Sequence, residues 1–181
     1  MQVKCGTDII RIERVAQAVR RMGQPFLDRI WTADEQADCL PANRRTEAFD
    51  ALQPTGVTVA GAASLAARFA AKEAVAKALG TGIGPLGVSW TDIVIYRQSG
   101  HDPADRSAIP DGEPPAMRRA PQVLLQGGAL RRYQLMGGQS ISISLTHDSG
   151  LAMAYCVLLH EPGAGNPAGD MSAAAGQGRA V

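Results

Sequence analysis

Three side chains of different chemistry recur at helical spacing in the middle of the chain. Phe69, Glu73 and Lys77 stand four residues apart, so an α-helix would place an aromatic ring, a carboxylate and an amine on one face. A carboxylate supplies the hard oxygen that a divalent cation prefers, and an ammonium group one turn later can meet a phosphate. The alternative is an ordinary exposed Glu–Lys pair, worth only a few tenths of a kcal/mol to the helix.

Two further polar residues, near the ends of the chain, could complete a metal and phosphate site. Asp8 follows a strand-like segment and is surrounded by apolar residues, where a carboxylate is costly to bury unless it is paired or bound to metal. The alternative is an exposed aspartate that opens a helix at Ile9. His147 is predicted at the tip of a hairpin, and its charge changes near neutral pH, which suits proton transfer. The alternative for His147 is a loop residue without a catalytic role.

The segments that carry these residues predict strands and helices in one mixed domain. Ser64 is the expected N-cap of the central helix and Gly80 its end, while Gly6 suits a close backbone approach. Thr32 and Glu35 have the spacing of a capping box. A hairpin with interleaved helices predicts the α+β class. The expected strands are 2–7, 92–97, 122–125 and the hairpin 140–159; the expected helices are 11–22, one starting near residue 32, 64–79 and 129–136.

Composition excludes some classes of function. The 181 residues include 18 basic and 17 acidic side chains, which gives no nucleic-acid signature. We expect no signal peptide and no membrane span, because the N-terminus is mixed and no apolar run approaches 18 residues. Three cysteines without metal-ligand spacing predict a reducing, cytoplasmic location. Residues 1–160 are predicted to form one domain, and the Gly/Ala-rich residues 161–181 a disordered tail.

Four motifs together resemble those of holo-[acyl-carrier-protein] synthase, the small trimeric class of 4′-phosphopantetheinyl transferases. They are Gly-Thr-Asp-Ile at 6–9, Arg-Phe-Ala-Ala-Lys-Glu-Ala-Val-Ala-Lys-Ala at 68–78, Gly-Thr-Gly-Ile-Gly at 80–84 and Ser-Ile-Ser-Leu-Thr-His-Asp at 142–148. The central motif is highly specific, and the outer ones are strong in combination with it. The resemblance covers about residues 1–36, 64–97 and 122–159. The loops 41–62 and 98–121 are longer than the family needs.

The resemblance implies a fold, a reaction and a set of site residues. The fold would be a phosphopantetheinyl transferase-like α+β domain, an antiparallel sheet packed on a long helix, assembled as a homotrimer with active sites between subunits. The reaction would be Mg²⁺-dependent transfer of 4′-phosphopantetheine from coenzyme A to a serine of apo acyl carrier protein, leaving adenosine 3′,5′-bisphosphate, in support of fatty acid biosynthesis. Asp8 and Glu73 would hold the metal. The residues expected to contact coenzyme A are Lys77, Gly80, Gly82, His147 and Arg45, with Arg44 as a further candidate for the nucleotide and Asp148 as an alternative base.

The resemblance also implies an acidic carrier helix as partner, for which a basic surface is needed. Arg14 and Arg21 are seven residues apart on the first predicted helix and so share a face. The alternative is that these arginines are merely solvated. Two other functions stay open: a non-catalytic carrier-binding module of the same fold, and another Mg²⁺-dependent phosphotransferase such as a nucleotide kinase. The chain lacks a Gly-x-x-x-x-Gly-Lys-Ser/Thr loop, which argues against the commonest kinase.

Overall fold

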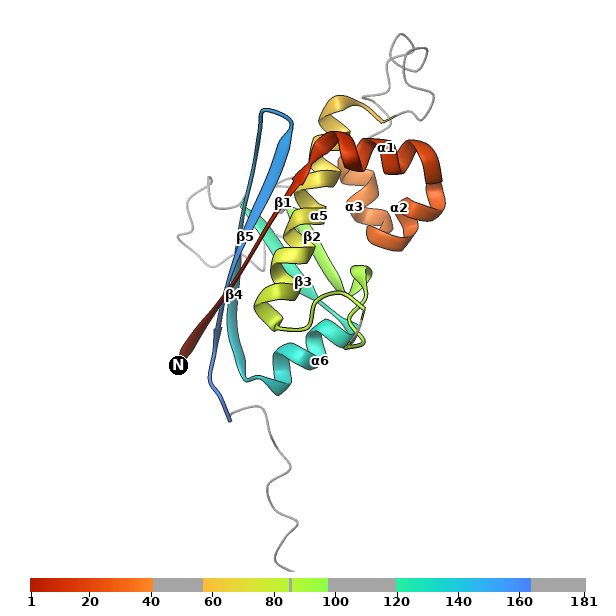
Figure 1. Ribbon diagram of the computed structural model, residues 1–181. Helices are drawn as coiled ribbons and strands as arrows, with labels where there is room; N and C mark the ends of the chain where they lie inside the picture. The colour runs from red at the N-terminus through yellow and green to blue at the C-terminus, as the bar shows by residue number, and fades with distance from the viewer. Residues whose placement is uncertain (41–56, 85, 98–119, 164–181) are drawn as a thin grey trace, which may run out of the picture.

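The long helix α5 (Val59–Leu79) is the centre of the molecule, and it packs along a three-stranded antiparallel sheet (Figure 1). The computed structural model describes residues 1–40, 57–84, 86–97 and 120–163. The sheet strands are β1 (Gln2–Arg11), β4 (Gly138–Asp148) and β5 (Leu151–His160), in the order β1-β5-β4. The predicted α+β class and the hairpin are therefore confirmed.

Alternation along the strands divides the sheet into an inner and an outer face. On β5, Ala152, Ala154, Cys156 and Leu158 are buried against α5. The residues between them face outward in register with the outward side chains of β1 and β4; for example, Thr7 and Ser144 both pair with Tyr155. The outer face carries exposed apolar side chains that nothing in the described chain covers: Val3, Ile9, Leu151, Met153 and Tyr155.

Helix α5 begins earlier than the sequence predicted. Its N-cap is Thr58, whose hydroxyl accepts from the Gly61 amide, so the expected N-cap at Ser64 is wrong. The expected loop 41–62 included Gly61, which lies in the first turn of α5. A Cβ at this position would lie 3.1 Å from the Cys39 carbonyl oxygen, so Gly61 serves close helix packing rather than a loop. Gly80 ends the helix in the left-handed conformation, with φ of 74°, as predicted.

Helices α1 (Ile12–Met22), α2 (Gln24–Ile30) and α3 (Ala33–Cys39) lie together on the side of α5 away from the sheet (Figure 1). The capping box of Thr32 and Glu35 is present at the start of α3, as expected. The sequence did not predict α2, which follows directly after Gly23 and has a proline in its first turn. Trp31 is fully buried beneath this group of helices, between Phe26 and Phe69.

A smaller sheet lies behind α5 in the view of Figure 1 and contacts β4. It consists of β2 (Ile93–Arg97) and β3 (Pro121–Leu125), which pair in antiparallel fashion, as predicted from segments 92–97 and 122–125. The one-turn helix η2 (Trp90–Asp92) precedes β2, and α6 (Gly127–Leu135) follows β3 and lies near the C-terminal end of α5 (Figure 1). Within the described residues, no helix is both long and apolar enough to cross a membrane.

Candidate active site

Strand β1 brings Asp8 to the face of α5 that carries Lys77. The Lys77 Nζ donates to Asp8 Oδ1 at 2.8 Å and to the Thr7 carbonyl oxygen at 2.8 Å. The close approach that makes this possible occurs at Gly6, where an added Cβ would stand 1.9 Å from the Ala74 carbonyl oxygen. The predicted strand 2–7 is confirmed but continues to Arg11, so Asp8 lies within it rather than at its end, and the alternative of a helix opening at Ile9 is wrong.

Glu73 lies one helical turn before Lys77 and shares the site with Asp8. Burial raises the pKa of Glu73, and the neighbouring Asp8 carboxylate raises it further, whereas the Lys77 ammonium acts in the opposite direction. Two carboxylates close enough to repel one another are an arrangement that a divalent cation relieves. Of the residues that the structure describes, no three or more His, Cys, Asp or Glu side chains gather into a metal cluster.

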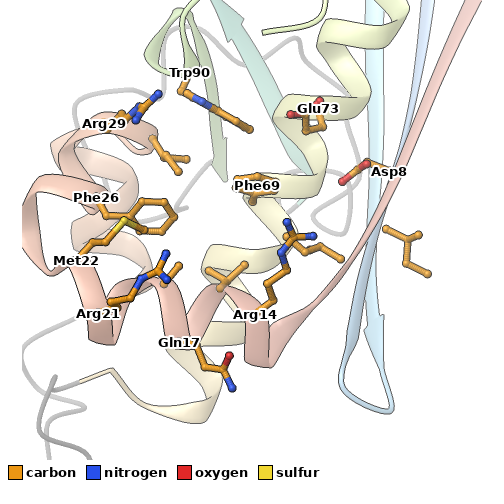
Figure 2. A pocket seen from close by; sticks show the side chains of 15 residues that line it. Asp8, Arg14, Gln17, Arg21, Met22, Phe26, Arg29, Phe69, Glu73 and Trp90 are labelled. Carbon is orange, nitrogen blue, oxygen red and sulfur yellow. The ribbon is translucent and has the colours of Figure 1, made fainter. Parts of the chain in front are cut away.

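A cleft of about 880 Å³ opens beside these carboxylates (Figure 2). Asp8 and Glu73 lie at one end, and the partly buried rings of Phe69 and Trp90 continue the wall with centroids 4.5 Å apart. The spacing of Phe69 and Glu73 correctly predicted that they share a face. Sequence reasoning missed Trp90 and, among the other apolar lining residues, Met22, Phe26 and Ile30. The only signal for Met22, Phe26 and Ile30 was the apolar pattern of the segments that form α1 and α2.

The opposite wall of the cleft is basic. Arg14 and Arg21 line it from α1, as their spacing predicted, and Arg29 joins them from α2 (Figure 2). All three are exposed. Arg29 was not foreseen because its helix was not predicted. The two carboxylates thus lie at one end of the cleft, and a basic, partly apolar wall extends away from them.

His147 does not join this cleft within a single chain. It lies two residues from the hairpin turn on β4, opposite Ala152 of β5, and Ala152 in turn pairs with Ile10 of β1. Strand β5 therefore separates His147 from the strand that carries Asp8, and neighbouring strands lie about 4.8 Å apart. His147 instead lines a second pocket of about 260 Å³, which includes Arg68, Arg97 and Thr146.

The glycine loop after α5 uses its amides to end the helix. The Gly80 amide donates to the Lys77 carbonyl oxygen, and the Gly82 amide donates to that of Ala76 at 3.3 Å. A ligand contact at Gly80 or Gly82 would therefore depend on their small size rather than on unpaired N–H groups. A Cβ built on Gly82 meets no atom within 4 Å. The predicted contacts of Arg44 and Arg45, the two long loops apart from their described ends, and most of the proposed tail fall outside the described residues.

Comparison with known proteins agrees with this geometry. Residues 4–122 match the model of the 4′-phosphopantetheinyl transferase superfamily. The holo-[acyl-carrier-protein] synthase of Nitrobacter hamburgensis is 37% identical over 87% of this chain and 94% of its own. That of Rhodopseudomonas palustris is 38% identical over 91% of this chain and 97% of its own.

The solved structures show the same fold. Helicobacter pylori holo-[acyl-carrier-protein] synthase, crystallised in complex with coenzyme A, is 28% identical. It superposes with a TM-score of 0.58, and the match covers 86% of this chain and 99% of that one. The chain therefore belongs to the holo-[acyl-carrier-protein] synthase family of 4′-phosphopantetheinyl transferases, as the four motifs predicted.

Proposed function

We propose that this protein transfers 4′-phosphopantetheine from coenzyme A to a serine hydroxyl of an apo acyl carrier protein, in support of fatty acid biosynthesis. Family membership supports the reaction class, and one observation carries the assignment to a site: Asp8 and Glu73 lie at the end of a cleft, and Lys77 is paired with Asp8. Phosphoryl transfer depends on positioning and charge neutralisation more than on a protein nucleophile. A site of two carboxylates and one ammonium suits that chemistry.

Asp8 and Glu73 would hold Mg²⁺. The donor set fits, because Mg²⁺ is usually bound by one or two carboxylates together with substrate phosphates and water. When bound, the ion would neutralise charge on the pyrophosphate of coenzyme A. Lys77 holds Asp8 at 2.8 Å, which orients that carboxylate, and its exposed ammonium can also meet a phosphate oxygen.

The basic wall of the cleft is proposed to receive the carrier. Arg14, Arg21 and Arg29 are exposed and flank an apolar groove, which suits an acidic helix with some apolar side chains. This position places the carrier's serine near the carboxylate end of the cleft. The carrier itself can be free or a domain of a larger synthase, and a panel of both kinds would identify it.

Three copies are proposed to assemble through the outer face of the three-stranded sheet. That face exposes Val3 and Ile9 at 60% and 59%, together with the apolar stripe on β5, and a sheet must bury its apolar faces. Assembly would also give His147 a role. Because it lies in a pocket apart from Asp8, we propose that the His147 pocket of one copy completes the cleft of the next and contacts coenzyme A there.

A complementation experiment tests this shared site. Asp8→Ala and His147→Ala should each be inactive, with loss of at least a hundredfold in transfer measured by intact mass of the carrier. If the site is shared, co-assembled mixtures of the two variants regain activity, because some interfaces combine an intact Asp8 with an intact His147. Mixtures that assemble but stay inactive would contradict the shared site. Activity of Asp8→Ala in excess chelator would contradict the metal assignment itself.

The alternatives are separated by the donor and by the product. A non-catalytic carrier-binding module would bind the carrier without adding mass to it. A nucleotide kinase would accept ATP in place of coenzyme A. We expect coenzyme A and Mg²⁺ together to add phosphopantetheine to at least one apo carrier, and ATP to add nothing. We further propose residues 1–160 as the catalytic unit and a reducing cytoplasm as its location, in keeping with three free cysteines.

A further inference from the structure

A buried ion pair lies directly behind the cleft, on the residue next to the proposed metal ligand. Lys72 precedes Glu73 on α5 and is 0% exposed, and its partner Glu35 on α3 is 2% exposed. Lys72 Nζ donates to Glu35 Oε2 at 2.8 Å. Neither residue lines the cleft, and the reaction proposed above uses neither of them.

The ammonium group of Lys72 joins three elements. Besides Glu35, it donates to the Trp90 carbonyl oxygen at 3.0 Å and to the Ile93 carbonyl oxygen at 2.6 Å. All three ammonium protons are therefore used. The two carbonyls bracket helix η2, so Lys72 holds both ends of the turn that carries Trp90.

The carboxylate of Glu35 completes the network from the other side. Its Oε1 accepts from the Ile95 amide at 3.0 Å, and its Oε2 accepts from the Thr32 amide at 2.9 Å. Glu35 thus contacts the start of α3 and the middle of β2 at the same time. The capping box predicted from sequence is one part of a connection that runs from α3 through α5 to η2.

Such a network is an inefficient way to gain stability alone. Removing both charges from water costs several kcal/mol, and apolar replacements of similar size are often neutral or stabilising. Burial lowers the pKa of Lys72, and the Glu35 carboxylate acts in the opposite direction. What an apolar pair could not supply is a set of directed bonds to the two carbonyls of the Trp90 turn.

The position of Trp90 matters because its ring forms the cleft wall beside Glu73. The ring lies 4.5 Å from that of Phe69, and both line the cleft (Figure 2). We infer that Glu35 and Lys72 are positioning residues: their buried ion pair holds the Trp90 turn, and thereby the cleft wall, in the geometry that transfer requires. This inference rests on the proposed function.

The decisive variant replaces both members of the pair by methionine, Glu35→Met with Lys72→Met. We expect it to fold with a lower melting temperature, because the Ile95 and Thr32 amides lose their acceptor and the Trp90 and Ile93 carbonyls lose a donor. At a temperature well below melting, kcat should fall about tenfold, with the KM for coenzyme A within twofold. Acrylamide quenching should also increase about twofold. It reports on Trp90, since the only other tryptophan, Trp31, is fully buried.

Val75→Ala is the matched control. Val75 is buried on the same helix and lies outside the cleft, so its truncation should lower the melting temperature and leave kcat and quenching unchanged. A paired variant with kcat within twofold of wild type, or with lower kcat but unchanged quenching, would overturn the inference. If the paired variant does not fold, the same two measurements, kcat and acrylamide quenching, are made on Glu35→Gln and decide in the same way. If the wild type transfers nothing from coenzyme A, the proposed function fails, and quenching still decides whether the ion pair holds Trp90.

Discussion

Replacing Gly6 with alanine tests how closely β1 must approach α5. The added Cβ would lie 1.9 Å from the Ala74 carbonyl oxygen and 2.9 Å from the Ala78 amide nitrogen. Both are backbone atoms of a buried helix, so neither can rotate away. Alanine is compatible with the strand conformation, since Gly6 is not among the residues with positive φ. To restore a separation of about 3.0 Å, the strand and the helix must move apart by about 1.1 Å.

This displacement acts on stability and on the site. Overpacking of this kind costs about 1–3 kcal/mol, which corresponds to a fall in melting temperature of roughly 3–10 °C. The Lys77–Asp8 pair, 2.8 Å apart, would open to about 3.9 Å, beyond hydrogen-bond distance. A misplacement of about 1 Å can cost a hundredfold in rate, so we expect activity to fall by about that factor.

The assay measures the melting temperature by calorimetry and transfer by intact mass across a range of Mg²⁺ concentrations. Gln2→Ala is the control, because Gln2 is exposed on the same strand and lies outside the set of outward residues proposed for assembly. Its melting temperature and rate should match the wild type. If Gly6→Ala melts within 1 °C of the wild type and retains full activity, the close approach of β1 to α5 does not position Asp8.

Three further predictions concern charge and the chain end. Burial and Asp8 raise the pKa of Glu73 above its ordinary value of 4.5. The stability that this group contributes is therefore present below pH 4.5 and is lost as the pH rises through the raised pKa. Glu73→Gln should therefore raise the melting temperature of the chelated protein near pH 7.5 and leave it unchanged near pH 4; a lower melting temperature of the variant near pH 7.5 would contradict this. Arg14→Glu and Arg21→Glu should each raise the carrier KM, more so at low salt, while KM for coenzyme A stays constant; an unchanged carrier KM would mean that this face is only solvated. Truncation after Pro162 should leave assembly, melting temperature and transfer rate unchanged, and loss of assembly would show that residues 163–181 contribute to it.

The sequence predicted those features whose signals are local. The alternation of Ser142, Ile143 and Ser144 specified a strand, Gly80 a helix end, and the Thr32–Glu35 spacing a capping box; all three are confirmed. Local signals failed where the conformation of a residue depends on a contact with a segment that is distant in the sequence. Gly61 indicated a loop but permits α5 to pack on α3.

The candidate site was predictable only in part, for the same reason. Helical spacing placed Phe69, Glu73 and Lys77 on one face, but their meeting with Asp8 depends on a strand whose Asp8 lies 69 residues before Lys77, and only the family resemblance indicated it. No local pattern links Lys72 to Glu35, which lies 37 residues away. Buried charges with distant partners leave no periodic trace in a sequence.

Alternate residues of strand β1 lie on opposite faces of the sheet and have different proposed roles. Gly6 and Asp8 face the helix and belong to the proposed active site, whereas Thr7 and Ile9 face outward and belong to the surface proposed for assembly. Substitutions on one face can therefore accumulate without disturbing the other. An insertion or deletion has no such freedom, because a one-residue shift would exchange the two sets at once. Strand β1 can therefore tolerate substitutions during evolution more readily than insertions or deletions.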